Sequence, residues 1–237
     1  MPSTADSTMW VIIPAAGSGR RMGVSHRPKQ YLDLLGRTVI EWAVEPFLRH
    51  AGCRSIVIVI ARSDVLWSQN PVSQLEGVFV ACGGEERVDS VRAGLASLSG
   101  ARAHDWVLVH DAARPCLRDS DLHQLIAALQ DDPVGGLLAT PLTDTLKRAN
   151  DEGYVAETVP RHNLWRALTP QMFRYEVLQR ALDNAAEQRT AVTDEAQAVE
   201  LLGLRPRLVS GSADNLKITT PDDLDQAARV LAARGIR

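Results

Sequence analysis

The sequence predicts an α/β fold built on a mostly parallel sheet, and three observations lead to this expectation. Short apolar runs rich in β-branched residues, typical of fully buried strands, alternate along the chain with longer stretches of helical periodicity. Such alternation indicates βαβ units, whose helices cover both faces of a parallel sheet. The 237 residues, 45% of them hydrophobic, are enough for one well-packed domain.

The individual elements follow from these patterns. The expected strands are the apolar runs at 10–13, 56–60 and 106–109, with weaker candidates at 78–81 and 136–140. Apolar stripes at helical spacing predict helices at 39–48, 87–98, 122–129, 175–186 and 195–202. A last helix is expected to begin with Thr220 as its N-cap and Pro221 at its first position, because proline is preorganised for that place.

The alternation breaks at residues 141–165, which hold few core-forming runs. They indicate two short polar strands around a turn at 150–153, and we expect a β-arm that projects from the main sheet. Residues 1–8 are expected to be disordered. Residues 9–237 would then form a single domain that includes the arm.

Charge and cysteine usage exclude several classes of protein. A formal net charge of −3 gives no general attraction to nucleic acid or to an anionic membrane. The three cysteines form no C-x-x-C pair, which argues against a zinc site and a disulfide framework and fits a reducing cytoplasm. The start of the chain lacks the features of a signal peptide, and its apolar runs are too short to span a bilayer. We therefore expect a soluble cytoplasmic protein with no nucleic-acid or membrane partner.

The segment 14–22, directly after the first expected strand, is the first candidate for binding chemistry. Ligands of open parallel sheets bind beyond the carboxyl ends of strands, and small residues with two glycines let backbone N–H groups approach an anion. Met22 stands where a dinucleotide fingerprint has its third glycine, and no G-K-[ST] of a P-loop follows. A purely structural turn is the alternative. Lys29 lies one short loop beyond Arg21, and the two form a candidate triphosphate clamp.

Two further segments lie where expected strands end. In 83–90, two glycines allow close approach of a base or ribose, and Ser90 can hydrogen-bond a base edge; a turn before an acidic helix N-terminus is the alternative. In 110–115, Asp111 is placed to hold a magnesium ion that bridges phosphates, although a helix cap is its alternative role. Arg114 offers a bidentate phosphate contact.

Two other observations complete the candidate set. His110 is expected to be a packed histidine rather than a general base. The segment 214–219, far away in sequence, adds another carboxylate, Asp214, and another lysine, Lys217.

Eight segments between residues 14 and 219 resemble, in order, those of one family. They are PAAGSGRRM, RPKQY, GGEERVDSV, VHDAARP, DTLKRA, LWRALTPQMF, VTDEA and ADNLKIT. The family is 2-C-methyl-D-erythritol 4-phosphate cytidylyltransferase, of the non-mevalonate isoprenoid pathway. The opening motif is shared with many sugar nucleotidyltransferases, whereas HDAARP, LTPQ, TDEA and DN-x-K together are much more specific. The resemblance implies a Rossmann-like nucleotidyltransferase domain, a homodimer held by the β-arm, a Mg²⁺ cofactor, and CTP and methylerythritol phosphate as substrates.

The resemblance also implies a role for individual residues. The cytosine and ribose would be surrounded by Ala15, Ala16, Gly17, Gly84, Glu85, Ser90 and Ala112. The catalytic cations at the triphosphate would be Arg21, Lys29 and Lys217. Asp111 would approach the metal, with Asp214 as a weaker candidate. The methylerythritol phosphate pocket would be lined by Arg114, Thr169 and Thr193, together with Thr145 and Arg161 from the arm of the partner subunit. Glu85 is one methylene longer than the Asp that many relatives carry there.

The expected reaction is an in-line attack by a phosphate oxygen on the α-phosphorus of CTP, with pyrophosphate leaving from the opposite side. The attacking group is already an anion, so positioning and cationic stabilisation would supply most of the catalysis. Three alternatives remain at this point. The acceptor could be ribitol phosphate or another sugar phosphate, the protein could bind nucleotide without catalysis, or it could be a dehydrogenase. The presence of all four of Arg21, Lys29, Asp111 and Lys217 disfavours the second, and the absent third glycine disfavours the last.

Overall fold

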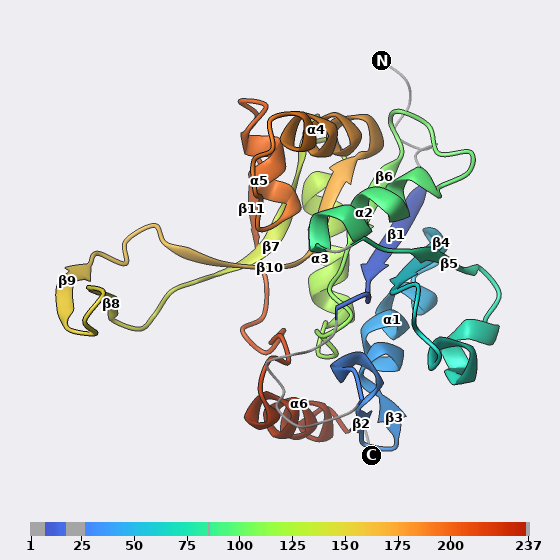
Figure 1. Ribbon diagram of the computed structural model, residues 1–237, viewed down its shortest axis with the longest axis horizontal. Coiled ribbons are helices and arrows are strands. Elements are labelled where there is room, and N and C mark those ends of the chain that lie inside the picture. The colour runs from blue at the N-terminus through green and yellow to red at the C-terminus, as the bar shows by residue number, and fades with distance from the viewer. Residues whose placement is uncertain (1–7, 18–26, 85, 236–237) are drawn as a thin grey trace.

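A seven-stranded sheet forms the centre of the protein (Figure 1). The computed structural model describes residues 8–17, 27–84 and 86–235. In spatial order the strands are β11 (Arg207–Ser210), β7 (Gly135–Pro141), β10 (Trp165–Arg174), β6 (Trp106–Val109), β1 (Met9–Pro14), β4 (Cys53–Ile60) and β5 (Val78–Cys82). Neighbouring strands pair in parallel except where β10 is involved, which runs antiparallel to both β6 and β7. The predicted mostly parallel α/β sheet is confirmed.

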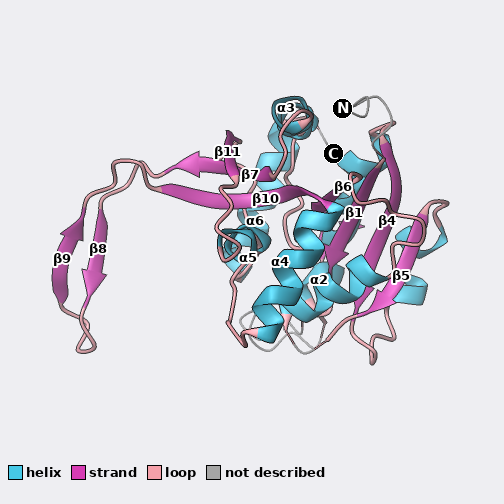
Figure 2. Ribbon diagram, turned by 90° about the horizontal axis from the view of Figure 1, so that it is seen from above, coloured by secondary structure: helices cyan, strands magenta, loops and turns pink. Residues whose placement is uncertain are grey.

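Helices cover both faces of this sheet because its central strands alternate their apolar side chains between two cores. Val11 and Ile13 of β1 point into a cluster with α1 (Val39–Arg49) and α3 (Asp119–Leu129). Trp10 and Ile12 point into a second cluster on the opposite face. That cluster packs against α2 (Arg87–Ala96), α4 (Tyr175–Glu187) and α5 (Glu195–Glu200), of which α2 and α4 lie side by side in Figure 2.

Smaller elements surround the ends of the sheet. The α6 helix (Pro221–Ala233) packs through Ala227 and Leu231 against a third apolar cluster that includes Leu34 and Trp42. Other small elements are a two-stranded sheet of β2 (Asp33–Leu34) and β3 (Arg37–Thr38), and the 3₁₀ turns η3 (Lys29–Tyr31), η4 (Trp67–Gln69) and η5 (Pro71–Gln74). None of the helices in the described ranges is both long and apolar enough to cross a membrane.

The predicted strands and helices are confirmed with small shifts at their ends. The last helix begins as predicted, with Thr220 in a capping box and Pro221 at the first position. The strands β10 and β11 of the central sheet and the short strands β2 and β3 were not predicted. Pro170 within a run argues against a strand, but a bulge between Ala167 and Gln171 leaves it outside the ladder with β7. The short β11 strand lies at the sheet edge and is mostly exposed, so it lacks the apolar run of a buried strand.

A hairpin occupies the segment for which an arm was expected. It consists of β8 (Leu146–Ala149) and β9 (Val155–Val159), which pair antiparallel around the turn that Asn150 and Gly153 close. The hairpin continues from β7 and β10, since Leu142 N donates to Leu164 O at 3.0 Å. Figures 1 and 2 show it extending away from the sheet and its helices.

The N-terminal boundary differs from the expectation that residues 1–8 are disordered. The backbone N–H of Thr8 donates to Asp105 Oδ1 at 3.2 Å, and its carbonyl accepts from Trp106 N at 2.9 Å. These bonds extend the pairing of β1 with β6 by one residue, which no local sequence signal indicates. Residues 1–7 lie outside the described part of the chain.

Gly136 offers a test of the packing between β7 and β11. A Cβ at this position would lie 2.0 Å from the backbone carbonyl oxygen of Arg207, so a strand would have to move. We expect Gly136→Ala to lower the free energy of unfolding by about 3 kcal/mol, as severe overpacking does. Urea denaturation at fixed protein concentration measures this change.

Gly100→Ala is the matched control, because nothing lies within 4 Å of its added Cβ while its φ is +86°. Only the left-handed backbone would be penalised there, at about 1–2 kcal/mol. Equal losses of stability in the two variants would show that the close approach of β11 is wrong.

Candidate functional site

A pocket opens at the edge of the sheet where parallel strands end. Because β1, β5 and β6 run in the same direction, the segments that follow them meet at one edge. The pocket is lined by Pro14, Ala15, Ala16, Gly17, Lys29, Gln30, Gly84, Glu86, Arg87, Ser90, Asp111, Ala112, Ala113 and Lys217. Most of its wall is thus small residues, and its charged groups come from four separate segments.

Two glycines after β5 let the start of α2 approach the loop after β1. A Cβ on Gly83 would lie 2.5 Å from Ser90 Oγ and 2.9 Å from Ala16 Cβ. A Cβ on Gly84 would lie 2.4 Å from Asp89 Cβ, so both positions need glycine to keep this corner closed. The loop after β1 is fixed from its other side, where Gln30 Nε2 donates to Ala15 O at 2.7 Å. The corner is therefore rigid and leaves a narrow space between two backbones.

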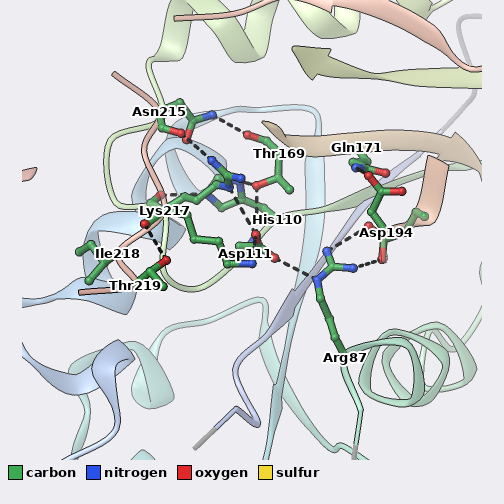
Figure 3. A network of polar contacts seen from close by, with 12 residues as sticks. Arg87, His110, Asp111, Thr169, Gln171, Asp194, Asn215, Lys217, Ile218 and Thr219 are labelled. Atoms are coloured by element: carbon green, nitrogen blue, oxygen red, sulfur yellow. Dashed lines mark hydrogen bonds and ion pairs between the residues drawn. The ribbon is translucent and has the colours of Figure 1, made fainter. Parts of the chain in front are cut away.

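A buried carboxylate, Asp111, lies at the centre of the charged side of the pocket (Figure 3). Its Oδ1 accepts from Arg87 Nε at 3.1 Å. Its Oδ2 lies 2.8 Å from Lys217 Nζ and 3.3 Å from Arg114 Nε. Burial alone would raise the pKa of Asp111, but these three cations outweigh it and hold the pKa well below its ordinary value. The carboxyl is thus a permanent anion.

Lys217 reaches the pocket because its segment is hydrogen-bonded to the loop after β6 and to the middle of β10. Asn215, completely buried, donates from Nδ2 to Thr169 O at 2.6 Å, and its own carbonyl accepts from Arg114 at 2.7 Å. Ile218 N donates to Ala113 O at 2.8 Å, and Ile218 O accepts from Lys29 Nζ at 2.9 Å. The two pocket lysines are therefore positioned by one short stretch of backbone.

His110 is buried beneath the pocket and makes two hydrogen bonds. Arg114 O can only accept, so His110 Nε2, 3.0 Å away, donates to it. In the neutral ring Nδ1 then accepts from the hydroxyl of Thr169 at 2.8 Å, while Thr169 Oγ1 accepts from the N–H of Asp111. Burial lowers the pKa of His110 to about 4, so the ring is neutral near pH 7. The ring also packs against Phe47, with centroids 5.3 Å apart. The expectation of a packed histidine is confirmed.

Comparison with known proteins identifies the family. The model of the family described as IspD, 2-C-methyl-D-erythritol 4-phosphate cytidylyltransferase, matches residues 9–233.

The chain belongs to this family.

Named relatives agree with the assignment. The chain is 54% identical over 217 residues to the 2-C-methyl-D-erythritol 4-phosphate cytidylyltransferase of Pseudomonas paraeruginosa, covering 91% of this chain and 92% of that protein. The enzyme of that name from Pseudomonas putida is 50% identical over 218 residues, with the same coverage. The protein is therefore an enzyme, a nucleotidyltransferase.

Solved structures show the same fold. The crystal structure of the Francisella tularensis cytidylyltransferase matches with a TM-score of 0.84 at 34% identity, covering 95% of this chain and all of that one (100%). The enzyme of the same name from Thermus thermophilus gives a TM-score of 0.78 at 31% identity, covering 95% and 99%. The Rossmann-like nucleotidyltransferase domain implied by the motifs is confirmed.

Most of the predicted nucleotide and catalytic residues of this cytidylyltransferase come together in the pocket. Those that line it are Ala15, Ala16, Gly17, Lys29, Gly84, Ser90, Asp111, Ala112 and Lys217. Arg21 and Glu85 lie outside the described residues, so their predicted roles stay predictions. Asp214, the weaker metal candidate, is paired with Arg118 and Arg234 and does not line the pocket.

The predicted acceptor residues are not gathered in the same way. Arg114 and Thr169 are buried behind Asp111 and contact it. Thr193 precedes α5, where its N–H and hydroxyl both donate to Gln197 Oε1. Thr145 and Arg161 flank the β8–β9 hairpin, which Figure 2 shows far from the ends of β1 and β5. Arg161 donates there to Thr143 O.

Sequence reasoning missed one important pair, Arg87 and Glu195. Arg87 lines the pocket, and its two terminal nitrogens bind both oxygens of Glu195 at 2.5 and 3.0 Å. Burial alone would lower the pKa of Arg87, but Glu195 and Asp111 together raise it above its ordinary value. Two features of the sequence could have drawn attention to these residues. Arg87 begins a helix shortly after two glycines, and Glu195 begins an apolar helical stretch. Neither residue reveals its partner in the sequence.

The buried neutral ring of His110 predicts a dependence of stability on pH. Its folded pKa of about 4 lies below the ordinary 6.5, so the unfolded chain binds a proton between these values and the folded chain does not. This contribution is fully present above pH 6.5 and is lost as the pH falls to 4, by up to about 3 kcal/mol. Urea denaturation between pH 4 and pH 7 measures the slope.

The variant His110→Gln removes the titrating ring while keeping a polar side chain beside Thr169. Its stability should depend less on pH over this range than that of the wild type. An unchanged slope would show that folding does not lower the pKa of His110.

Proposed function

We propose that the protein transfers CMP from CTP to 2-C-methyl-D-erythritol 4-phosphate, giving 4-diphosphocytidyl-2-C-methyl-D-erythritol and pyrophosphate. Besides membership of the family, one geometric observation supports the proposal. Lys29 and Lys217, from opposite ends of the chain, meet in a pocket that is otherwise lined mostly by small residues. Such a pocket has room for a flat base and ribose at one side and a cluster of cations for phosphates at the other.

The residues of the pocket suit an in-line displacement on phosphorus. The attacking phosphate oxygen is already an anion and needs no general base, which accords with the neutral His110 beneath the pocket. Lys29 and Lys217, with Arg21, would neutralise the triphosphate and the charge that develops at its α-phosphorus. Fixed cations of this kind act because they need no reorganisation when the charge appears.

The nucleoside end of CTP would lie in the narrow corner between the loop after β1 and the start of α2. The residues proposed to surround cytosine and ribose are Ala15, Ala16, Gly17, Gly84, Glu85, Ser90 and Ala112. Support comes from the steric need for Gly83 and Gly84, which leaves space for a planar group but not for further side chains. The Ser90 hydroxyl lines this corner and donates to Glu86 O at 3.2 Å.

A Mg²⁺ ion is proposed to accompany the triphosphate. Within the described ranges, no group of three or more His, Cys, Asp or Glu side chains could hold a metal, and the carboxylates of the pocket are Asp111 and Glu86. This donor set fits magnesium, which is commonly bound by one or two carboxylates plus substrate phosphates. Asp111 would hold it. When bound, the ion would add positive charge at the phosphate oxygens.

The acceptor site is proposed to be completed by a second subunit. Arg114, Thr169 and Thr193 would contribute from one chain, and Thr145 and Arg161 from the arm of its partner in a homodimer. An isolated two-stranded hairpin is marginally stable in water, and the tip of this one exposes Tyr154 and Val155. Contact with a second chain would cover these side chains. The three cysteines are all unpaired, which supports a cytoplasmic location.

The proposed function is tested by incubating the protein with CTP, Mg²⁺ and 2-C-methyl-D-erythritol 4-phosphate and measuring pyrophosphate release. A cytidine diphosphate product should form, and replacing the acceptor with ribitol phosphate should abolish most of the rate. Faster turnover with ribitol phosphate would change the acceptor and keep the reaction class. Absence of product with every acceptor and divalent metal would refute the function.

Lys29→Ala should separate catalysis from binding. We expect kcat to fall by about 10²–10³, because one fixed cation is lost from the transition state, while the KM for CTP changes far less. Arg21→Ala should behave in the same way. Steady-state kinetics measure both values, with Arg229→Ala on the exposed face of α6 as the charge-matched control. A normal kcat in Lys29→Ala would rule out this role.

Arg161→Glu should affect the acceptor alone. We expect the KM for methylerythritol phosphate to rise by about 10–100-fold, the cost of replacing one charge-assisted contact with a repulsion, while the KM for CTP stays near the wild-type value. An equal rise in both constants would indicate a defect of the fold instead.

Mixing Arg161→Glu with Lys29→Ala then tests whether the arm crosses to the partner. If it does, a mixed dimer has one site with both defects and one site with neither, and activity returns. If each arm serves its own subunit, every site carries one defect and no activity returns. A different affinity tag on each variant, followed by purification through both tags in turn, isolates the mixed dimer and confirms that subunits have exchanged.

A further inference from the structure

Glu195 is a buried carboxylate for which the proposed reaction has no role. It is 1% exposed and opens α5 on the face of the sheet away from α1 and α3. A buried carboxylate is costly unless it is paired, and both of its oxygens are used by the terminal nitrogens of Arg87. The pairing is the fork-to-fork geometry that fixes a guanidinium in one orientation.

The remaining nitrogen of the same guanidinium, Nε, points to Asp111 in the pocket. With its two ends held by Glu195, Arg87 directs Nε at Asp111 Oδ1 over 3.1 Å. Figure 3 shows Arg87 rising from α2 to reach Asp111, and the guanidinium lines the pocket. The position of Glu195 therefore determines where Arg87 places the carboxylate of Asp111.

The charge of the pair is also balanced. Arg87 carries one positive charge and Glu195 one negative charge, so together they contribute no net charge to the pocket. Asp111 thereby gains a hydrogen-bond donor on Oδ1 without a further uncompensated cation. Its Oδ2 remains for Lys217 and Arg114. Loss of Glu195 would leave Arg87 to draw Asp111 away from these two groups.

Glu195 is itself held by the strand that crosses the site. Asp194 caps α5 by accepting from Gln197 N at 2.9 Å. Gln171 of β10, which is buried, donates to Asp194 Oδ2 at 3.0 Å and accepts from Ala196 N at 2.8 Å. The same strand presents Thr169 to the backbone of Asp111. Strand β10 therefore holds the start of α5, next to Glu195, through Gln171 and holds the backbone of Asp111 through Thr169.

We propose that Glu195 and Arg87 are a positioning pair for Asp111: Glu195 orients and neutralises Arg87, and Arg87 holds Asp111 where Lys217, Arg114 and the transferring phosphates require it. Neither residue needs to contact the reacting atoms. The inference rests on the proposed function, because Asp111 and Lys217 act in that reaction.

The test is a double-mutant cycle on kcat with Glu195→Gln, Asp111→Asn and the double variant. Glutamine keeps the size of the side chain, but its NH₂ group cannot accept the hydrogen bond from one of the terminal nitrogens of Arg87. We expect Glu195→Gln alone to lower kcat by about 10–100-fold, the range for residues that orient a ligand group. In the Asp111→Asn background the same change should cost less than about threefold, because its target is gone.

A merely structural ion pair between α2 and α5 would give a different result. The fold losses of kcat in the two single variants would then multiply in the double variant. The thermal midpoint of unfolding would fall together with the activity. The matched control is Asp183→Asn, which removes the 3.1 Å ion pair that joins the same helix α2 to α4 through Arg92. This pair is half exposed, and its loss should leave kcat within about twofold of the wild type.

Two further variants keep the test decisive. If Glu195→Gln does not fold, Arg87→Lys replaces it, since lysine keeps the charge but cannot bind Glu195 and Asp111 together. Glu195→Asp keeps the charge on a shorter side chain and should recover part of the lost kcat. Full additivity with Asp111→Asn, or wild-type kcat in Glu195→Gln, overturns the positioning role while the function stands. A wild-type protein without cytidylyl transfer overturns both.

Discussion

The site depends on one interaction, the contact of the Asp111 carboxylate with three cations from separate parts of the chain. Arg87 comes from α2, Arg114 from the loop after β6, and Lys217 from the segment after β11. Three cations so close together would repel one another without a buried anion, and the anion would be costly without them. Glu195 already neutralises the charge of Arg87. Asp111 therefore balances part of the charge of Arg114 and Lys217, and these contacts hold the side chains in position. A triphosphate can then enter a pocket whose cations are already in place.

The topology of the sheet explains how these segments meet. The parallel strands β1, β5 and β6 deliver three loops to one edge, as in other open α/β sheets. The antiparallel strand β10 adds a side-chain contact to the end of β6. Its pairing of Gln171 with Val109 sets Thr169 opposite Asp111, so a side chain from β10 supports the backbone at the end of β6. Towards its N-terminal end, the same strand leads back to the β8–β9 hairpin, which extends away from the sheet.

The nucleotide end and the acceptor end of the site are built on different principles. The nucleotide corner is enclosed by backbone, with Gly83 and Gly84 allowing α2 to close on the loop after β1. The residues proposed to bind the acceptor instead lie on elements that are far apart in one chain, since Thr145 and Arg161 flank the hairpin. Binding of the base would therefore be preorganised within a subunit, whereas binding of the acceptor phosphate would require assembly. Under this proposal, specificity for the acceptor would depend on the quaternary structure.

The sequence by itself determined the α/β class, the main strands and helices, the family and most residues of the nucleotide pocket. Apolar periodicity reports burial, and short glycine-rich and charged motifs directly follow strands, so both are local signals. Tertiary structure alone decided that β10 is a strand despite Pro170, that Thr8 extends β1, and that Arg87 meets Glu195. It also showed that Arg114 and Thr169 lie behind Asp111. These facts are pairings between distant segments, and a side chain's partner across a sheet depends on strand order and register, which no local pattern specifies.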